Sequence, residues 1–187
     1  MVNNIRYASI RNLDISNGEG VGVALFVQGC PFNPHCKNCF NPNTWDFNGG
    51  KEWTKQKEKE FLELVNRPYI KRISLLGGEP LADENLDSIL KLVNKINVLF
   101  PKKTIWIYTG YTFEQIMNPI VTDDFNPERD NLINKRKEIV KQCDVLVDSR
   151  YIDELRDITL KWRGSRNQRV IDIQKSLETN SMVLYCE

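Results

Sequence analysis

Short apolar stretches alternate with amphipathic ones along this chain. The apolar stretches are rich in Val, Ile and aromatic residues and are bounded by turn residues, which is typical of buried β-strands. They cover residues 21–28, 70–76, 104–109, 144–148 and 181–186. Because their apolarity is nearly continuous, we expect these strands to be covered on both faces, as in a parallel sheet.

Helical spacing fills most of the intervals. The clearest helix is predicted over 83–100, where Asp83 is a suitable N-cap and apolar residues recur every three or four positions. Other helices are predicted over 54–66, 112–117, 131–142 and 168–178. Strands that alternate with helices predict an α/β fold with a mainly parallel sheet and right-handed crossovers. A chain of 187 residues with 41% hydrophobic content is suited to a single domain over 1–187.

Charge and composition limit the possible binding partners and the cellular compartment of the protein. The formal net charge is +1, so there is no overall basic field that would draw the protein to nucleic acid or to an anionic membrane. The N-terminal stretch has no apolar core of a signal peptide, and the run "VGVALFV" is too short to span a bilayer. We therefore expect a cytoplasmic protein whose five cysteines are free or bound to metal.

Chemically suggestive residues follow four of the five predicted strands. Gly29 and a cysteine-rich loop follow the first, "GGEP" (77–80) the second and "GYT" (110–112) the third, while the fourth ends at Asp148 before Ser149 and Arg150. Parallel α/β folds place ligand sites at the carboxyl ends of their strands. We expect these motifs to meet at one edge of the sheet.

The loop "GCPFNPHCKNCF" carries Cys30, Cys36 and Cys39 together with the single histidine, His35. Structural zinc prefers four Cys or His ligands, and a C-x2-C pair is a common half-site. His35 could complete the set, but it is adjacent to Cys36, and no second C-x2-C occurs. Three unconnected free thiols are the plainest alternative, and that interpretation is retained for the isolated Cys143 and Cys186.

An iron–sulfur cluster is the third interpretation of this loop. Thiolates suit such clusters, but a cubane cluster normally takes four cysteines, so three would leave one iron without a protein ligand. An open metal position usually marks a site that binds a substrate.

The motifs resemble those of a known family. Three cysteines that end in C-x2-C followed by an aromatic residue, with "GGEP" about forty residues later, resemble the radical S-adenosylmethionine superfamily. The stretches 26–50, 75–81 ("LLGGEPL"), 106–112 ("WIYTGYT"), 144–151 ("DVLVDSRY") and 161–172 ("KWRGSRNQRVID") resemble its branch of glycyl-radical-enzyme activases for anaerobic ribonucleoside-triphosphate reductase. This likeness covers nearly the whole chain.

The resemblance implies a fold, a chemistry and partners. The fold would be a partial β/α barrel, and the three cysteines would hold a [4Fe-4S] cluster that also binds S-adenosyl-L-methionine. Reductive cleavage would yield methionine and a 5′-deoxyadenosyl radical, which makes a glycyl radical on the reductase; a donor such as flavodoxin would supply the electron. No side chain beyond the cluster and the cofactor would be catalytic, because the cofactors carry the difficult step.

The resemblance also implies a set of site residues. Glycines at 77 and 78 would let the backbone approach the cofactor, and Glu79 would accept a hydrogen bond from its ammonium group. Polar groups at the strand ends suit sugar hydroxyls, with Asp148 the first candidate. The basic stretch "KWRGSRNQR" is either an anion site or a solvated loop. The implied cofactor-binding residues are Asn38, Cys39, Phe40, Gly77, Gly78, Glu79, Thr109, Asp148, Ser149 and Arg166, and the metal ligands are Cys30, Cys36 and Cys39.

One feature departs from the family pattern. The usual spacing is C-x3-C-x2-C, whereas here five residues separate Cys30 from Cys36. Two extra residues change the loop-closure entropy only slightly, so the question is geometric; we expect an outward bulge. The alternative functions are activation of another glycyl-radical enzyme, of the formate-lyase type, and a zinc-stabilised interaction module without catalysis. A dinucleotide-binding enzyme is disfavoured because the sequence has no G-x-G-x-x-G and no phosphate-loop motif.

Overall fold

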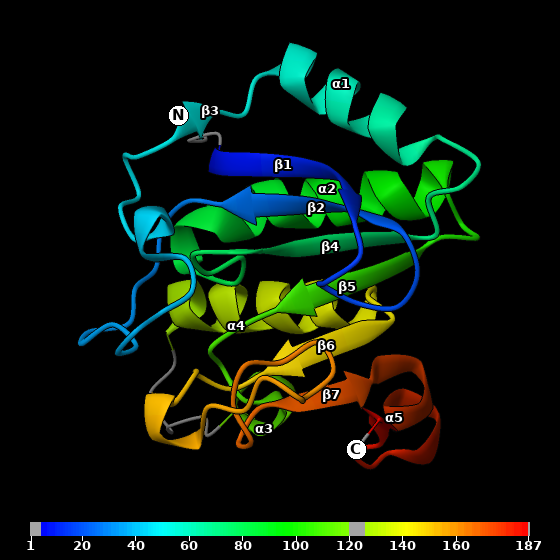
Figure 1. Ribbon diagram of the computed structural model, residues 1–187. Helices are drawn as coiled ribbons and strands as arrows, with labels where there is room; N and C mark the ends of the chain where they lie inside the picture. Colours follow the sequence, from blue (N-terminus) through cyan, green and yellow to red (C-terminus); the bar gives the residue numbers. More distant parts are fainter. Residues whose placement is uncertain (1–4, 120–125, 187) are drawn as a thin grey trace.

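The computed structural model describes residues 5–119 and 126–186. Within these ranges, eight strands form one open sheet in the order β3-β1-β2-β4-β5-β6-β7-β8 (Figure 1). The strands are β1 (Arg6–Asp14), β2 (Gly22–Val27), β3 (Lys51–Glu52), β4 (Arg72–Gly77), β5 (Thr104–Tyr108), β6 (Val145–Asp148), β7 (Arg169–Asp172) and β8 (Leu184–Cys186). The helices are α1 (Lys55–Val65), α2 (Leu86–Leu99), α3 (Phe113–Met117), α4 (Pro127–Lys141) and α5 (Ile173–Thr179), with 3-10 turns at Pro42–Thr44, Asp83–Asn85 and Asp153–Leu155.

The centre of the sheet is parallel and its flanks are antiparallel. Strands β2, β4, β5 and β6 pair in parallel, in register from Gly22 opposite Arg72 onward. The pairs β1–β2, β1–β3, β6–β7 and β7–β8 are antiparallel. The α/β class is confirmed, but the expectation of a mainly parallel sheet is correct only for the four central strands. The reason is that β1 and β2, and likewise β6 and β7, are joined by loops without an α-helical crossover, and strands joined in this way pair antiparallel.

Several element boundaries differ from those predicted. The helix predicted over 168–178 is wrong in its first half, because Arg169–Asp172 is strand β7 and the helix begins only at Ile173. Helix α4 begins at Pro127, four residues earlier than predicted, since Asn126 caps it by accepting a bond from Arg129 N (3.0 Å). The short last strand is an exposed edge strand rather than a buried one.

Strand β1 was not predicted at all. Its nine residues, "RYASIRNLD", are polar at every second or third position, and most of them are partly or fully exposed. A strand of this kind lacks the continuous apolar run of a central parallel strand. It forms because the edge of β2 offers it an antiparallel partner along the whole length.

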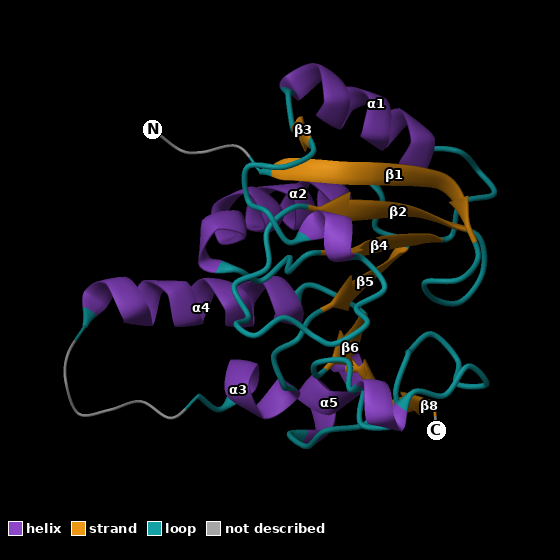
Figure 2. Cartoon of the chain, turned by 60° about the vertical axis from the view of Figure 1, so that its left-hand side comes forward, coloured by secondary structure: helices purple, strands orange, loops and turns teal. Residues whose placement is uncertain are grey.

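The main hydrophobic core lies between the sheet and its helices. Figures 1 and 2 show α2 and α4 on one side of the strands, with long loops on the other. Helix α2 presents Leu86, Ile89, Leu92, Val93 and Ile96, all fully buried, to this core, which confirms the apolar periodicity seen in the sequence. Among the described residues, no helix is both long and apolar enough to span a bilayer.

The opposite face of the sheet carries two smaller apolar clusters. One contains Ala24, Phe26 and Leu76, and the other contains Trp106, Val145, Val147 and Val170. No helix covers this face in the described part of the chain; instead the loops around residues 14–21, 28–50 and 149–168 fold over it. Phe26, Leu76 and Val147 form the floor of a cavity under these loops.

Candidate functional site

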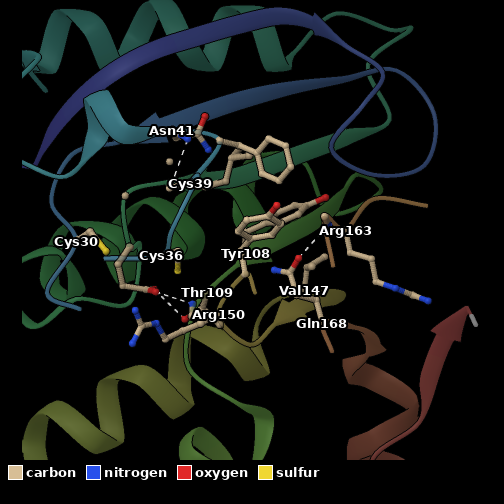
Figure 3. Close-up of a pocket in the computed structure, with 18 of the residues that line it drawn as sticks. Cys30, Cys36, Cys39, Asn41, Tyr108, Thr109, Val147, Arg150, Arg163 and Gln168 are labelled. Carbon is tan, nitrogen blue, oxygen red and sulfur yellow. Dashed lines mark hydrogen bonds between the residues drawn. The ribbon is translucent and has the colours of Figure 1, made fainter. Parts of the chain in front are cut away.

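The three clustered cysteines lie on the loop between β2 and β3. A backbone bond from Cys30 N to Trp45 O (3.0 Å) joins the start of this loop to its far side, and Cys39 N donates to Cys36 O (3.2 Å). All three cysteines line one cavity of about 530 Å³ (Figure 3). Because cavities of this size accommodate ordinary small-molecule ligands, the thiols are placed beside a ligand-sized space.

Residues that follow three neighbouring parallel strands line the same cavity. Gly77, Gly78 and Glu79 come from the end of β4, Thr109 and Gly110 from β5, and Ser149 and Arg150 from β6. The strands run in parallel and in sequence across the sheet, so their carboxyl ends share one edge. The prediction that these distant motifs meet at one edge is confirmed.

The "GGEP" turn is packed directly on the cysteine loop. A Cβ atom on Gly78 would lie 2.2 Å from Gly29 O and 2.6 Å from Thr44 O, so only glycine fits. Glu79 N donates to the same Gly29 oxygen (2.6 Å). Gly77 has a φ of +117° and its backbone abuts Val27. The glycines were expected to make room for a cofactor; in the structure the cysteine loop and β2 already occupy the space that a Cβ would need.

Glu79 is the buried centre of this edge of the sheet. It is 1% exposed, its Oε1 accepts from Leu81 N (2.9 Å) and Thr109 Oγ1 (2.8 Å), and its Oε2 accepts from Gly110 N (2.7 Å). Burial raises the pKa of this carboxyl to about 7, while the three hydrogen bonds act in the opposite direction. The carboxylate therefore fastens the ends of β4 and β5 together and also faces the cavity.

Phe40, Thr109 and Ser149 line the cavity as expected. The Phe40 ring is 59% exposed and contacts Tyr151 edge to face, with 4.9 Å between ring centroids. Ser149 has a φ of +76°, and its N–H donates to Tyr111 O (3.0 Å), which ties the end of β6 to the end of β5.

Three residues expected at the site do not line the cavity. Asp148 is fully buried behind it, where its carboxylate accepts from Phe113 N (2.8 Å) and from Arg169 Nε (3.1 Å). Asn38 lies on the outer side of the cysteine loop and donates to Asp153 Oδ2 (2.8 Å). Arg166 is exposed. Direct contact of these side chains with a cofactor stays a prediction, and Asp148 already has a structural role at the start of α3.

Sequence reasoning missed Tyr108 as a site residue. Tyr108 Oη and Arg163 Nε are buried at the cavity without a hydrogen-bond partner in the part of the chain that the structure describes. Figure 3 shows Tyr108, Arg163 and Gln168 on the side of the cavity away from Cys30 and Cys36. Both atoms therefore lack the partner that buried polar groups normally have. The signal was present in "WIYTGYT", where Tyr108 ends a strand immediately before Thr109.

Basic side chains surround this cavity. Among its described lining residues the cations are Arg11, Arg150 and Arg163, and Glu79 is the one carboxylate. Arg11 stacks over Phe26, with 4.6 Å from its guanidinium carbon to the ring centroid. The lining is therefore suited to a ligand with acceptor groups or negative charge.

His35 has a packing role. Its ring stacks on Trp45 with 4.1 Å between centroids and an interplanar angle of 12°. Among the described residues, no group of three Cys, His, Asp or Glu side chains converges closely enough to hold one metal ion. A single zinc ion needs four donors around one point, and the arrangement described here does not provide that set.

Burial raises the pKa of the Cys30 thiol to about 11, and the nearby Glu79, Cys36 and Cys39 add to this rise against a hydrogen bond from the Phe32 backbone. A thiol in such surroundings becomes a thiolate when a metal displaces its proton. At neutral pH the Cys30 thiol is therefore protonated, and it is not a free nucleophilic thiolate.

A family match assigns the class of this protein, that of iron–sulfur proteins. A family model described as "4Fe-4S single cluster domain" matches residues 16–171, which include all three cavity cysteines and the strand ends around them. All five cysteines are free thiols.

Similar proteins of known name show which family the chain belongs to. The anaerobic ribonucleoside-triphosphate reductase-activating protein of Escherichia coli K12 is 38% identical over 168 residues, 89% of this chain and 97% of the relative. The proteins of the same name from Enterobacteria phage T4 and Vibrio cholerae are 36% and 34% identical, over 89% and 88% of this chain and 93% and 96% of their own. The chain belongs to the family of anaerobic ribonucleoside-triphosphate reductase-activating proteins.

Proposed function

We propose that this protein activates an anaerobic ribonucleoside-triphosphate reductase by generating a glycyl radical on it. The observation that carries the proposal is the meeting of three thiols from one loop with the ends of β4, β5 and β6 around a single cavity. The names of the relatives supply the partner, and the matching family model supplies the type of metal centre.

The donor set fits a [4Fe-4S] cluster held by Cys30, Cys36 and Cys39. A cluster takes each thiolate at a different iron, so its ligands need not converge on one point as those of zinc do. Three thiols would leave one iron without a protein ligand, and the cavity beside the three cysteines would have room for S-adenosyl-L-methionine. When bound, this pair would supply the reductive cleavage that gives methionine and a 5′-deoxyadenosyl radical.

The side chains of the chain itself would bind and orient the cofactor. Ser149 Oγ and the backbone at Gly78 offer polar atoms along one wall, and Tyr108 Oη and Arg163 Nε offer unpaired donors along another. Burial raises the pKa of Tyr108 well above its ordinary value, so its hydroxyl stays protonated and donates. The apolar floor at Phe26 and Leu76 would keep water from the reacting atoms.

Other parts of the proposal follow from the family. The enzyme would be a radical S-adenosylmethionine oxidoreductase that takes its electron from a reducing donor such as flavodoxin. The three parallel pairings at the centre of the open sheet support grouping it with partial β/α barrels. A cytoplasmic location, as expected from the sequence, is part of the same proposal.

Anaerobic reconstitution with iron and sulfide tests the proposal. We expect the wild type to bind about four irons per chain, to release methionine from S-adenosyl-L-methionine under reduction, and to produce a glycyl-radical signal in electron paramagnetic resonance when purified reductase is added. Cys30→Ala should lose all three properties. Cys186→Ala is the matched control, because Cys186 lies on β8 outside the cavity, and it should keep them.

Two results would contradict the proposal. A colourless protein that holds one zinc per chain after anaerobic purification would indicate a structural metal site instead. A glycyl radical formed on a formate-lyase-type enzyme and not on the reductase would assign the activase to a different partner.

A further inference from the structure

The long spacing between Cys30 and Cys36 has a definite place in the fold. Of the five residues between the two cysteines, Pro31, Asn33 and Pro34 are exposed, but Phe32 turns inward and lines the cavity. The expected outward bulge is therefore correct only for the exposed residues, and the loop is fixed at its middle by an aromatic ring.

The ring of Phe32 sits in a slot formed by the ends of β5 and β6. A Cβ on Gly110 would lie 2.3 Å from the Phe32 ring, so the ring rests directly on the glycine. Tyr111 contacts it at 5.1 Å between centroids, and the guanidinium carbon of Arg150 lies 5.1 Å from its centroid on another side. Arg150 also donates to Pro34 O, so it holds the backbone of the loop as well as the ring.

The slot itself is rigidly built. Gly110 N donates to the buried Glu79, and the Tyr111 ring is stacked against Arg136 at 4.9 Å. Ser149 N donates to Tyr111 O (3.0 Å), which fixes the two strand ends relative to each other. Because the Phe32 ring is held in this slot, the loop residues on either side of it, including Cys30 and Cys36, are fixed relative to the sheet.

We propose that Phe32 and Arg150 are positioning residues that hold Cys30 and Cys36 at the cavity, and that the two extra loop residues exist to reach this slot. The assignment of the cysteines as cluster ligands rests on the proposed function; the anchoring of the loop does not. Without the anchor, the loop between the cysteines would sample many conformations and its thiols would be correctly placed only part of the time.

The anchor is tested first in the iron-free, reduced protein. We expect Phe32→Ala to raise the alkylation rate of Cys30 and Cys36 about tenfold, from the loss of one aromatic and one cation–π contact. The hydrogen-exchange rates of the non-proline amides between residues 30 and 36 should rise by a similar factor. Phe32→Tyr keeps the ring and should behave like the wild type. Gly110→Ala should reproduce the Phe32→Ala result although no residue of the cysteine loop is substituted, because its methyl group would displace the Phe32 ring. Tyr69→Ala, an exposed aromatic remote from the cavity lining, is the matched control.

Reconstitution gives the second measurement. We expect Phe32→Ala to bind fewer irons per chain and to give an altered cluster signal in electron paramagnetic resonance, and Phe32→Tyr to restore both. Unchanged alkylation and exchange in Phe32→Ala, or equal effects of the alanine and tyrosine variants, would overturn the proposal. If the wild type binds no cluster while its loop is still protected by Phe32, the proposed function fails and the anchor stands.

Discussion

Arg72 on β4 is a fully buried cation, and its removal gives a demanding test of the structure. Its side chain is 0% exposed and reaches the loop that follows β1. Nη2 donates to Asp14 O (2.8 Å) and to Asp14 Oδ1 (3.0 Å), Nη1 donates to Asn17 O (2.5 Å), and Nε donates to Glu19 O (3.3 Å). One guanidinium thus holds the loop whose Ser16 and Asn17 line the cavity.

The expected loss of stability in Arg72→Met depends on the groups that Arg72 leaves behind. Methionine fills much of the same volume but leaves the Asp14 carboxylate, 1% exposed, without its buried cation; the remaining cation is the half-exposed Arg11, whose Nη1 lies 3.8 Å from Asp14 Oδ2. Breaking a buried ion pair costs about 3–5 kcal/mol, because the charge left in the interior loses its closest partner. We expect a loss of about 4 kcal/mol in the free energy of unfolding at pH 7.

The loss should depend on pH. Burial opposes ionisation of Asp14, but the hydrogen bonds from Asn17 and Arg72 hold the pKa of its carboxyl below the ordinary value of 3.8. A depressed pKa stabilises the wild type above the unfolded pKa, and this contribution is lost as the pH falls. In Arg72→Met the carboxyl can take up a proton more easily, so the deficit relative to the wild type should be smaller at pH 4 than at pH 7.

Urea unfolding of the iron-free, reduced protein, followed by circular dichroism, measures these differences. Arg156→Met, a substitution at an exposed position, should change the stability by less than about 0.5 kcal/mol. Adding Asp14→Asn to Arg72→Met should recover part of the loss, because it removes the buried charge that has lost its closest partner. A loss below about 1 kcal/mol at pH 7, or one that does not shrink at pH 4, would refute this account of the pair.

Three further changes probe the edge of the sheet that carries the cavity. Gly78→Ala should cost about 1–3 kcal/mol in urea unfolding and lower the bound iron, since its methyl group meets two carbonyl oxygens of the cysteine loop; full iron binding at wild-type stability would contradict the close approach. Asn85→Ala should cost about 2–3 kcal/mol, because Asn85 Nδ2 donates to two buried carbonyl oxygens, Gln28 O (3.0 Å) and Glu79 O (2.9 Å); Asn97→Ala, a partly exposed amide with one such bond, should cost less. Because the folded pKa of Glu79 is raised to about 7 from an unfolded value near 4.5, its contribution to stability is full below pH 4.5 and is lost as the pH rises through 7. The urea midpoints of Glu79→Gln at pH 5 and pH 8 should therefore differ less than those of the wild type. An equal difference in the two proteins would show that burial does not shift the pKa of this carboxyl.

The central strands could be predicted because their signal is local. Strands such as β2 and β5 are covered on both faces, so nearly every residue is apolar and the run is visible in the sequence alone. Strands β1 and β7 could not be predicted in this way, since "RYASIRNLD" and "RVID" include polar residues and take their extended form from the neighbouring strand with which they pair.

The type of chemistry at the site could likewise be predicted from the sequence, but the set of residues that line the cavity could not. The three closely spaced cysteines between Cys30 and Cys39 already favour a metal–thiolate centre, because the capacity to bind metal is a property of the side chains themselves. Whether a strand-end residue faces the cavity depends on the direction of its side chain and on what packs behind it. Asp148 is turned toward Phe113 N and Arg169, whereas Tyr108 is turned into the cavity with its hydroxyl unpaired.

The sequence by itself therefore determined the central α/β layout, the group of three cysteines and the edge of the sheet at which the cavity forms, since each depends on composition and spacing along the chain. Only the tertiary structure decided which side chains line the cavity, why position 78 has no space for a residue larger than glycine, and where the additional residues between Cys30 and Cys36 lie. These outcomes depend on contacts between segments far apart in the sequence, such as Phe32 on Gly110 and Glu79 on Gly29, and no local pattern encodes a contact whose partner is supplied by the fold.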